Sequence, residues 1–232
     1  MAVGDRLRDR IELWGAPSCV NTAKCLFTGG EKGMDVTCIL FDPSSQDVQV
    51  RSPLGVGPIL CHKDFVVTGQ SAILSYMDDK GFGPSLVIRN GVVRAQMYQW
   101  TQYATEVVQP AMENDDDAKL GAAFDVLAKR LQDRGGAIRG DFICGEFSLA
   151  DIHWGACANM LFVKGKGSVV ESRSDVARWW GCIKEHPSTS KEKLKPFECM
   201  TTQADVQGNT LRNIDIHNYS ISASERGPRR FK

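Results

Sequence analysis

The sequence predicts an α/β region followed by an all-helical region. Apolar patterns at residues 11–14 and 36–41 are typical of strands, and residues 20–32 between them carry helical spacing. A strand, a helix and a strand within about 30 residues form a βαβ unit, so we expect these two strands to be parallel. Beyond residue 84 the chain shows only helical patterns. The fold class is therefore an α/β domain joined to an all-α domain.

The α/β region continues with a hairpin and a helix. Residues 52–60 lead into a third strand, and a fourth strand covers residues 64–67 after a tight turn at His62 and Lys63. Residues 70–79 have helical spacing. The segment Ser44–Arg51, between the second and third strands, is polar and short.

The break Gly81-Phe-Gly-Pro84 is the candidate domain boundary. Three helices are predicted beyond it besides the central one, each with apolar residues at helical spacing. They cover residues 91–112, with Asn90 as candidate N-cap; residues 115–134, opened by three aspartates that favour the positive end of a helix dipole; and residues 174–185, closed by Pro187.

The central helix begins at Ser148 and has the clearest start signal in the chain. Ser148 and Asp151 have the spacing of a capping box, in which each side chain bonds the backbone amide of the other residue. Residues 152–162 are apolar on nearly every side, which is typical of a buried helix. A buried helix cannot rely on water for its first amides, so the capping box is expected to nucleate it.

Composition excludes several classes of protein. The 232 residues carry 28 basic and 28 acidic side chains, which argues against a nucleic-acid-binding surface. No apolar run approaches the length of a membrane span. The eight cysteines contain no CxxC pair, which predicts a reducing compartment, no disulfide framework and no metal site. We expect an intracellular protein, located in the cytoplasm.

Two groups of residues leave alternatives open. Met97, Trp100 and Tyr103 share helical spacing that fits either a bundle core or the wall of a hydrophobic substrate pocket between the domains. His153 and Trp154 lie on the central helix, where core packing is favoured over a ligand-binding role.

Four motifs in order resemble those of the cytosolic glutathione transferases, over residues 11–197. Gly145-Glu-Phe-Ser-Leu-Ala-Asp-Ile152 is similar to the capping-box signature of their helical domain, and Arg178-Trp-Trp180 to an Arg/Trp pair on a late helix. Ser52-Pro-Leu-Gly-Val-Gly-Pro58 is similar to the segment that carries their cis-proline, and Ala72-Ile-x-x-Tyr76 to the helix after their fourth strand. The resemblance implies a thioredoxin-like N-terminal domain and an all-helical C-terminal domain.

The resemblance also implies domain limits. Residues 1–80 would form the thioredoxin-like, glutathione-binding domain, 81–88 the linker, and 89–199 the helical domain. Residues 200–232 are a polar extension, poor in apolar residues, that cannot bury enough surface to fold alone.

A glutathione transferase must stabilise a thiolate, because the glutathione thiol is largely protonated at neutral pH. In the family the stabilising group follows the first strand. Cys19 falls where plant members carry the catalytic serine, with Ser18 beside it. A cysteine there resembles the omega, lambda and dehydroascorbate-reducing classes, which form a mixed disulfide with glutathione. Cys19 or Ser18 is therefore the expected catalytic residue; the alternative is that Cys19 only fills the turn.

The resemblance further assigns glutathione binding to Gly57 and Pro58, through the backbone beside the cis-proline, and to Gln70 or Ser71. Aligned on Ala72 and Ile73, the family's Glu-Ser or Gln-Ser pair falls on Gly69 and Gln70, whereas a one-residue slip would make it Gln70 and Ser71. The segment before the cis-proline is also several residues shorter than in the family.

Two functions follow. The first is a glutathione-dependent transferase of the thiol-transfer or reductive type, acting on a small hydrophobic or disulfide substrate as a homodimer. The second is a non-catalytic relative that serves as a binding or assembly subunit of a larger complex, with residues 200–232 contacting a protein partner.

Overall fold

The computed structural model describes residues 11–16, 18–39, 41–133 and 139–186. The predicted polar extension at 200–232, and the predicted end of the helical domain beyond residue 186, lie outside these ranges.

A four-stranded mixed sheet forms the N-terminal half, in the order β2-β1-β3-β4. Its strands are β1 (Ile11–Trp14), β2 (Val36–Ile39), β3 (Ile59–His62) and β4 (Phe65–Thr68). The predicted parallel pairing of β1 with β2 is confirmed, and β3 pairs antiparallel with both β1 and β4. The predicted turn is one residue early: His62 still belongs to β3, and Lys63 turns the chain with a φ of 56°.

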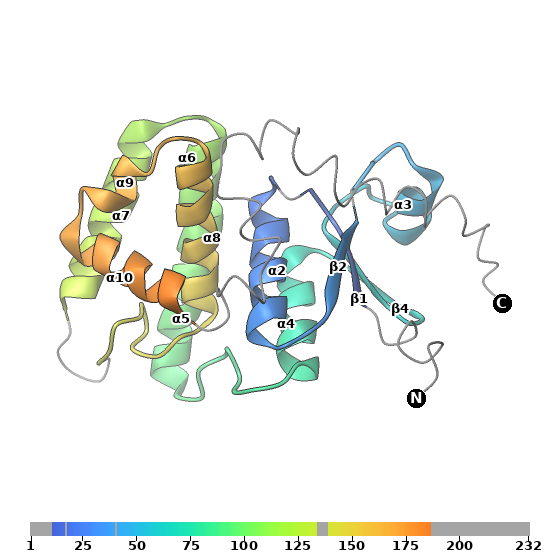
Figure 1. Ribbon diagram of the computed structural model, residues 1–232, viewed down its shortest axis with the longest axis horizontal. Coiled ribbons are helices and arrows are strands. Elements are labelled where there is room, and N and C mark those ends of the chain that lie inside the picture. The colour runs from blue at the N-terminus through green and yellow to red at the C-terminus, as the bar shows by residue number, and fades with distance from the viewer. Residues whose placement is uncertain (1–10, 17, 40, 134–138, 187–232) are drawn as a thin grey trace.

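Three helices flank this sheet. The helices α2 (Val20–Glu31) and α4 (Gln70–Lys80) lie between the sheet and the C-terminal helices, and α3 (Gln46–Arg51) lies on the opposite side of the sheet (Figure 1). α3 occupies the segment that the sequence marks only as short and polar. It is capped by the Ser45 hydroxyl, which accepts from the amide of Val48, and Val48 is its single fully buried side chain. One buried residue in six gives too little periodicity to predict a helix.

The C-terminal half is all helical in the described residues, as predicted. It contains α5 (Gly91–Tyr103), a π-helical turn η1 (Ala104–Val108), α6 (Gln109–Glu113), α7 (Asp117–Gln132), α8 (Leu149–Val163), α9 (Ser168–Glu171) and α10 (Ser174–Glu185). The single helix predicted over residues 91–112 is thus interrupted. Pro110 has no amide proton with which to continue the α-helical pattern, and the π turn ends two residues before it.

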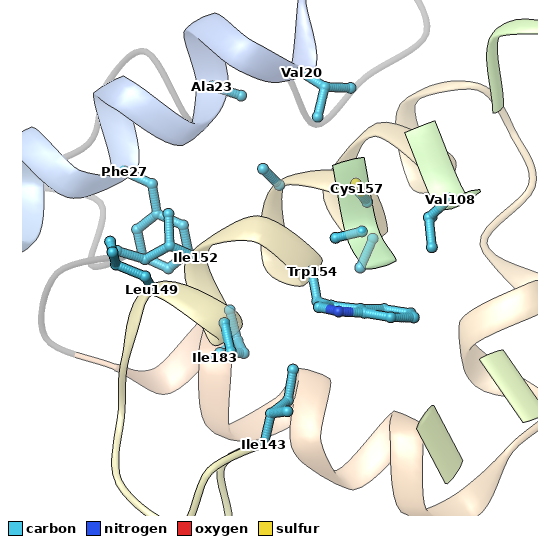
Figure 2. Packing of buried hydrophobic residues seen from close by; sticks show 14 of the residues in the cluster. Val20, Ala23, Phe27, Val108, Ile143, Leu149, Ile152, Trp154, Cys157 and Ile183 are labelled. Carbon is cyan, nitrogen blue, oxygen red and sulfur yellow. The ribbon is translucent and has the colours of Figure 1, made fainter. Parts of the chain in front are cut away.

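The two halves share one hydrophobic core, in which α2 packs on α8. Figure 2 shows Phe27 of α2 lying beside Leu149 and Ile152 of α8, with Trp154 further along the same helix. The side chains of Phe27, Ile152 and Trp154 are inaccessible to solvent. Apolar contact across the two halves, at about 25 cal/mol for each Å² buried, therefore holds the helical region against the sheet layer.

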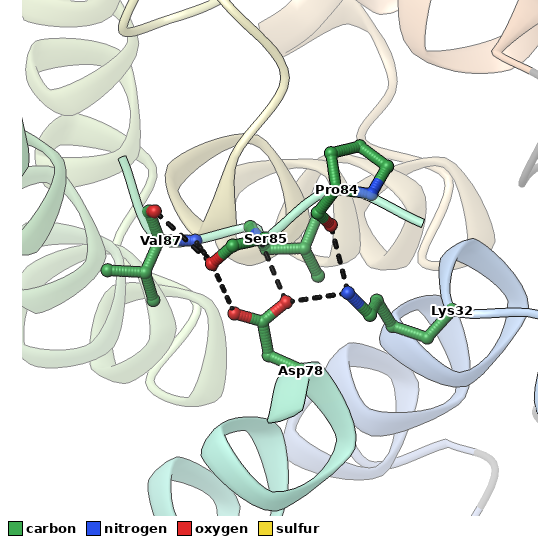
Figure 3. A network of polar contacts seen from close by, with 6 residues as sticks. Lys32, Asp78, Pro84, Ser85 and Val87 are labelled. Atoms are coloured by element: carbon green, nitrogen blue, oxygen red, sulfur yellow. Dashed lines mark hydrogen bonds and ion pairs between the residues drawn. The ribbon is translucent and has the colours of Figure 1, made fainter. Parts of the chain in front are cut away.

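A buried ion pair anchors the connection between the halves (Figure 3). Lys32, the residue after α2, lies 3.0 Å from the carboxylate of Asp78 on α4, and both side chains are at most 5% exposed. Asp78 also accepts from the amide of Leu86 and the hydroxyl of Ser85, while Lys32 donates to the carbonyl of Pro84. One cluster thus joins both helices to the segment that leads into α5.

We expect Asp78→Asn to lower the free energy of unfolding by roughly 3–5 kcal/mol, because Lys32 would remain as a buried charge without its partner. Asp79→Asn is the matched control, since Asp79 is the exposed neighbour on the same helix, and it should change stability by less than about 0.5 kcal/mol. Urea unfolding at neutral pH measures both values.

The same pair gives a pH dependence. Burial acts to raise the pKa of Asp78, but hydrogen bonds from Leu86, Lys32 and Ser85 outweigh it and lower the pKa. This stabilisation is therefore complete above the unfolded-state pKa of about 3.9 and is lost as the pH falls through the lower folded-state pKa. The stability gap between wild type and Asp78→Asn should narrow in acid; a gap that stays constant there would contradict the assignment.

Candidate functional site at the edge of the sheet

The strand registers bring three chain segments to one edge of the sheet. Trp14, the last residue of β1, pairs with Ile59 at the start of β3, and Ile59 pairs with Thr68 at the end of β4. The residues just beyond these positions, Gly15, Pro58 and Gly69, therefore lie at the same edge. The amide of Gly69 donates to the carbonyl of Pro58 at 3.2 Å. The peptide bond between Gly57 and Pro58 is cis.

Helix α2 begins at this edge. Cys19 is its N-cap residue, with extended φ and ψ of −90° and 124°, and its side chain makes no capping hydrogen bond. The side chain is half-buried, and Ser18 beside it is exposed. Because the first amides of a helix have no partner within it, the N-terminus of α2, where Cys19 lies, favours a negative charge.

The loop before α2 is held close to the helix by Gly15. A Cβ atom built on Gly15 would collide with the side chain of Thr22, a buried residue on the first turn of α2. Gly15 also donates to the carbonyl of Ile39 at the end of β2. The turn from β1 into α2 is therefore held against α2 through Thr22 and against β2 through Ile39. These contacts also fix the position of Cys19.

Helix α4 begins at the same edge, and its start explains an unusual feature of the sequence. Gly69 is the N-cap residue and has a φ of 90°, a conformation that costs glycine little and other residues more. The helix begins with Gln70, so Gln70 and Ser71 occupy its first turn. Ser71 is exposed, whereas Gln70 is only 9% exposed and turns its side chain inward, with its Nε2 atom 3.2 Å from Nε2 of His153.

A pocket of about 410 Å³ lies between α4 and α5, next to the start of α4. Gln70, Ser71 and His153 line it together with polar and charged side chains from both helices and the segment between them, among them Arg89, Arg94 and Tyr98. This pocket has no local sequence signal, because its lining residues come from segments up to 83 positions apart.

The remaining predicted residues have structural positions. Ser148 and Asp151 form a capping box at the start of α8, with the amide and the hydroxyl of Ser148 both donating to Oδ2 of Asp151. Met97 is fully buried, and Trp100 and Tyr103 pack their rings on Trp154. These three residues therefore belong to the bundle core, and none of them lines the pocket beside α4.

Lys24 is the residue near the site that sequence reasoning missed. Its side chain is inaccessible to solvent, and its Nζ atom donates to Asn21, Thr105 and Gln109 at 3.1–3.3 Å. Burial lowers the pKa of Lys24, while nearby thiols and Glu113 act in the opposite direction. The only sequence signal was a lysine on the helix face otherwise buried in the core.

The part of the chain that the structure describes contains no cluster of three or more side chains suited to a metal ion. Within those residues, too, no helix has the length and apolar character needed to cross a membrane.

Comparison with known proteins identifies this architecture. A glutathione transferase F7 structure from Populus trichocarpa superposes with a TM-score of 0.68 at 24% identity, over 81% of this chain and 99% of that one. A glutathione S-transferase structure from Methylobacillus flagellatus with GSH bound gives a TM-score of 0.66 at 18% identity, over 83% and 99% of the two chains. The chain has the glutathione transferase fold.

Sequence similarity to the glutathione transferases is more limited. The glutathione S-transferase Z2 of Arabidopsis thaliana is 32% identical over 98 residues, which is 40% of this chain. The chain thus spans 43% of the length of that curated relative. No protein-family model matches the sequence. The resemblance and the two-part fold class predicted from the motifs are confirmed.

In this glutathione transferase fold, we expect Cys19 to be alkylated by iodoacetamide faster than the buried cysteines. Cys25 and Cys157 are inaccessible to solvent, and burial raises the pKa of the Cys157 thiol to about 11 and that of Cys25 still further, so neither supplies a reactive thiolate. Peptide mapping by mass spectrometry over a time course measures each site. Cys19→Ser is the control, and modification of Cys25 or Cys157 before Cys19 would contradict the predicted placement.

Proposed function

We propose that the chain is a glutathione-dependent transferase in which Cys19 forms a mixed disulfide with glutathione. The observation that carries the proposal is the position of Cys19, half-buried at the N-cap of α2 and at the sheet edge that also holds the cis-Pro58 bond and the start of α4. The proposal draws support from the Methylobacillus flagellatus glutathione S-transferase structure, which has GSH bound and shares this fold.

The residues at this edge suit the parts of a tripeptide thiol. The backbone N–H and C=O groups beside the cis bond of Gly57 and Pro58 would pair with the peptide backbone of glutathione. The first amides of α4, at Gln70 and Ser71, would hold the γ-glutamyl carboxylate, because a helix N-terminus favours negative charge. The exposed hydroxyl of Ser71 would add a donor. The cysteinyl sulfur would then face Cys19.

The proposed reaction is thiol–disulfide exchange on a substrate that is a mixed disulfide of glutathione. The thiolate of Cys19 attacks the glutathionyl sulfur, so the substrate's disulfide breaks, a Cys19–glutathione disulfide forms, and the other half leaves as a thiolate that takes up a proton. A second glutathione thiolate then attacks the glutathionyl sulfur bound to Cys19. This step releases glutathione disulfide and restores the Cys19 thiolate, so the electrons come from glutathione.

We expect saturable binding of reduced glutathione to the purified wild-type chain, measured by calorimetry. Cys19→Ser should retain binding, because Ser preserves the size of the side chain and the helix N-terminus remains, but it should lose thiol transfer. After incubation with glutathione disulfide, mass spectrometry should find a glutathione adduct on Cys19 in the wild type and none in Cys19→Ser.

Other outcomes separate the alternatives. Binding without an adduct on Cys19 would leave Cys19 as a residue that fills the turn and would point to Ser18, the exposed hydroxyl beside it. Absence of binding at millimolar glutathione would overturn the proposal. It would favour the second function, a non-catalytic binding or assembly subunit.

Gly69 is the position where the alignment on Ala72 and Ile73 places the family's Glu or Gln, and here it offers no side chain. A Cβ atom built there meets nothing within 4 Å, although the φ of 90° would strain it. We therefore expect Gly69→Gln to bind glutathione roughly threefold to tenfold more tightly, the equivalent of one added hydrogen bond of about 0.5–1.5 kcal/mol. Calorimetry measures the affinity.

Gly69→Ala is the matched control, because it carries the same backbone strain without the amide. It should lower the melting temperature as Gly69→Gln does and leave glutathione affinity unchanged. Equal affinities for the two variants would show that no γ-glutamyl group lies near residue 69.

The remaining parts of the proposal concern setting and partners. We propose a homodimer, with a small hydrophobic or disulfide compound as second substrate and a protein partner for residues 200–232. We also propose a reducing, cytoplasmic setting, as the cysteine usage of the sequence indicates.

A further inference from the structure

A partly buried chain of polar side chains connects the first turn of α2 with the first turn of α4. It runs from Asn21 through Lys24, Thr105 and His153 to Gln70, with successive contacts of 3.3, 3.3, 3.3 and 3.2 Å. Its two ends belong to the helices that begin at the candidate site. Its middle belongs to the helical region, to η1 and α8.

Lys24 anchors the α2 end of the chain as an ammonium group. An ammonium has three N–H donors, and Lys24 has three oxygen acceptors, on Asn21, Thr105 and Gln109. A neutral amine would have only two donors for these three oxygens. None of the three acceptors is a carboxylate, so the charge is held by neutral groups from α2, η1 and α6.

Thr105 is the junction of the chain, and its hydroxyl is fully used. The hydroxyl donates its single proton to the carbonyl of Thr101 at 2.9 Å. Its oxygen then accepts from Lys24 and contacts Nδ1 of His153. One donor and two acceptors are the full capacity of a hydroxyl group. With this proton assigned to the Thr101 carbonyl, Nδ1 of His153 takes the donor role in their contact.

The hydrogen bond with Thr105 fixes the state of His153. Burial lowers the pKa of His153 to about 3, with a further contribution from the charge of Lys24 and an opposing one from the Thr101 carbonyl. The ring is therefore neutral at neutral pH, with its proton on Nδ1. Nε2 then accepts from Nε2 of Gln70, which fixes the orientation of the Gln70 amide.

The π-helical turn η1 contributes to this arrangement. Thr105 is the second residue of η1 and Gln109 follows it directly, so the turn presents both oxygens to Lys24. Isolated π turns within helices occur frequently at functional sites. The π turn is thereby connected to the candidate site, which lies at the N-termini of α2 and α4.

We propose that this chain sets the positions of the two helix N-termini relative to each other, with Thr105 and His153 as positioning residues for the candidate site. α2 would place the thiol group and α4 the γ-glutamyl group, so the chain would fix the spacing between the two ends of glutathione. The part that concerns glutathione rests on the proposed function; the coupling of the two helices does not.

Hydrogen exchange tests the coupling without any ligand. The amide of Ala23 bonds the carbonyl of Cys19, and the amide of Ile73 bonds that of Gly69, so these two amides report opening of the first turns of α2 and α4. Thr105→Val keeps the shape of the side chain but removes one of the three acceptors of Lys24 and the hydroxyl that Nδ1 of His153 contacts. It should accelerate exchange at both amides roughly tenfold, while Thr105→Ser, which keeps the hydroxyl, should stay within about twofold of wild type.

Two further measurements keep the test decisive. The amides of α10 should exchange at the wild-type rate, because acceleration there would mean general destabilisation and would overturn the proposal. His153→Leu removes the contacts to Thr105 and Gln70 but keeps Lys24 on Thr105, so it should accelerate exchange at Ile73 and leave exchange at Ala23 unchanged. This variant also decides the matter if Thr105→Val does not fold. Wild-type exchange at Ile73 in His153→Leu would overturn the proposal.

Calorimetry with reduced glutathione tests the positioning role. Thr105→Val should bind at least about fivefold more weakly than Thr105→Ser. Equal glutathione affinities of these two variants would overturn the role of the polar chain in glutathione binding, even if hydrogen exchange at Ala23 and Ile73 changes as expected. If the wild type does not bind glutathione, the proposed function fails, and the exchange measurements still decide whether the chain couples the two helices.

Discussion

The carboxylate of Asp151 is the interaction on which the helical half depends. It is fully buried and accepts from the amides of Ile143 and Ser148, from the hydroxyl of Ser148 and from the indole of Trp179. Burial raises its pKa to about 6 despite these four donors, so this group's contribution to stability falls as the pH rises from about 4 to about 6. The Asp151 side chain thereby joins the start of α8 to the preceding loop and to α10.

The position of α8 then determines what reaches the candidate site. Because α8 packs on α2, successive residues after the capping box serve different layers: Ile152 contacts the region of Phe27, Trp154 fills the bundle core, and His153 extends to Gln70. A shift of α8 by one residue would remove His153 from both Thr105 and Gln70. The capping box therefore sets the register of the polar chain as well as the start of a helix.

The sequence predicts the features that depend on local pattern and cannot predict those that depend on partners distant in the chain. The strands, the parallel pairing and the start of α8 follow from periodicity and from the residues at helix starts, and α10 spans the predicted residues 174–185. Most of the fold can therefore be predicted from the sequence. By contrast, the inward turn of Gln70 depends on His153, 83 residues away, and Lys24 finds acceptors more than 80 residues away. The local pattern places Lys24 on an apolar helix face, but it does not show which acceptors the lysine reaches.

The same polar chain bears on the choice between an enzyme and an assembly subunit. A buried ammonium with only neutral partners costs desolvation energy that an apolar side chain would avoid. A subunit that needed only to keep its shape would gain nothing from Lys24, whereas a site that must hold the two ends of one ligand at a fixed spacing gains from directional bonds. Gly69 offers no side chain at the sheet edge, but the first amides of α4, the cis bond at Pro58 and Cys19 at the N-cap of α2 all lie there. Directional bonds that fix both helix starts are therefore better explained by ligand binding at the sheet edge than by packing alone.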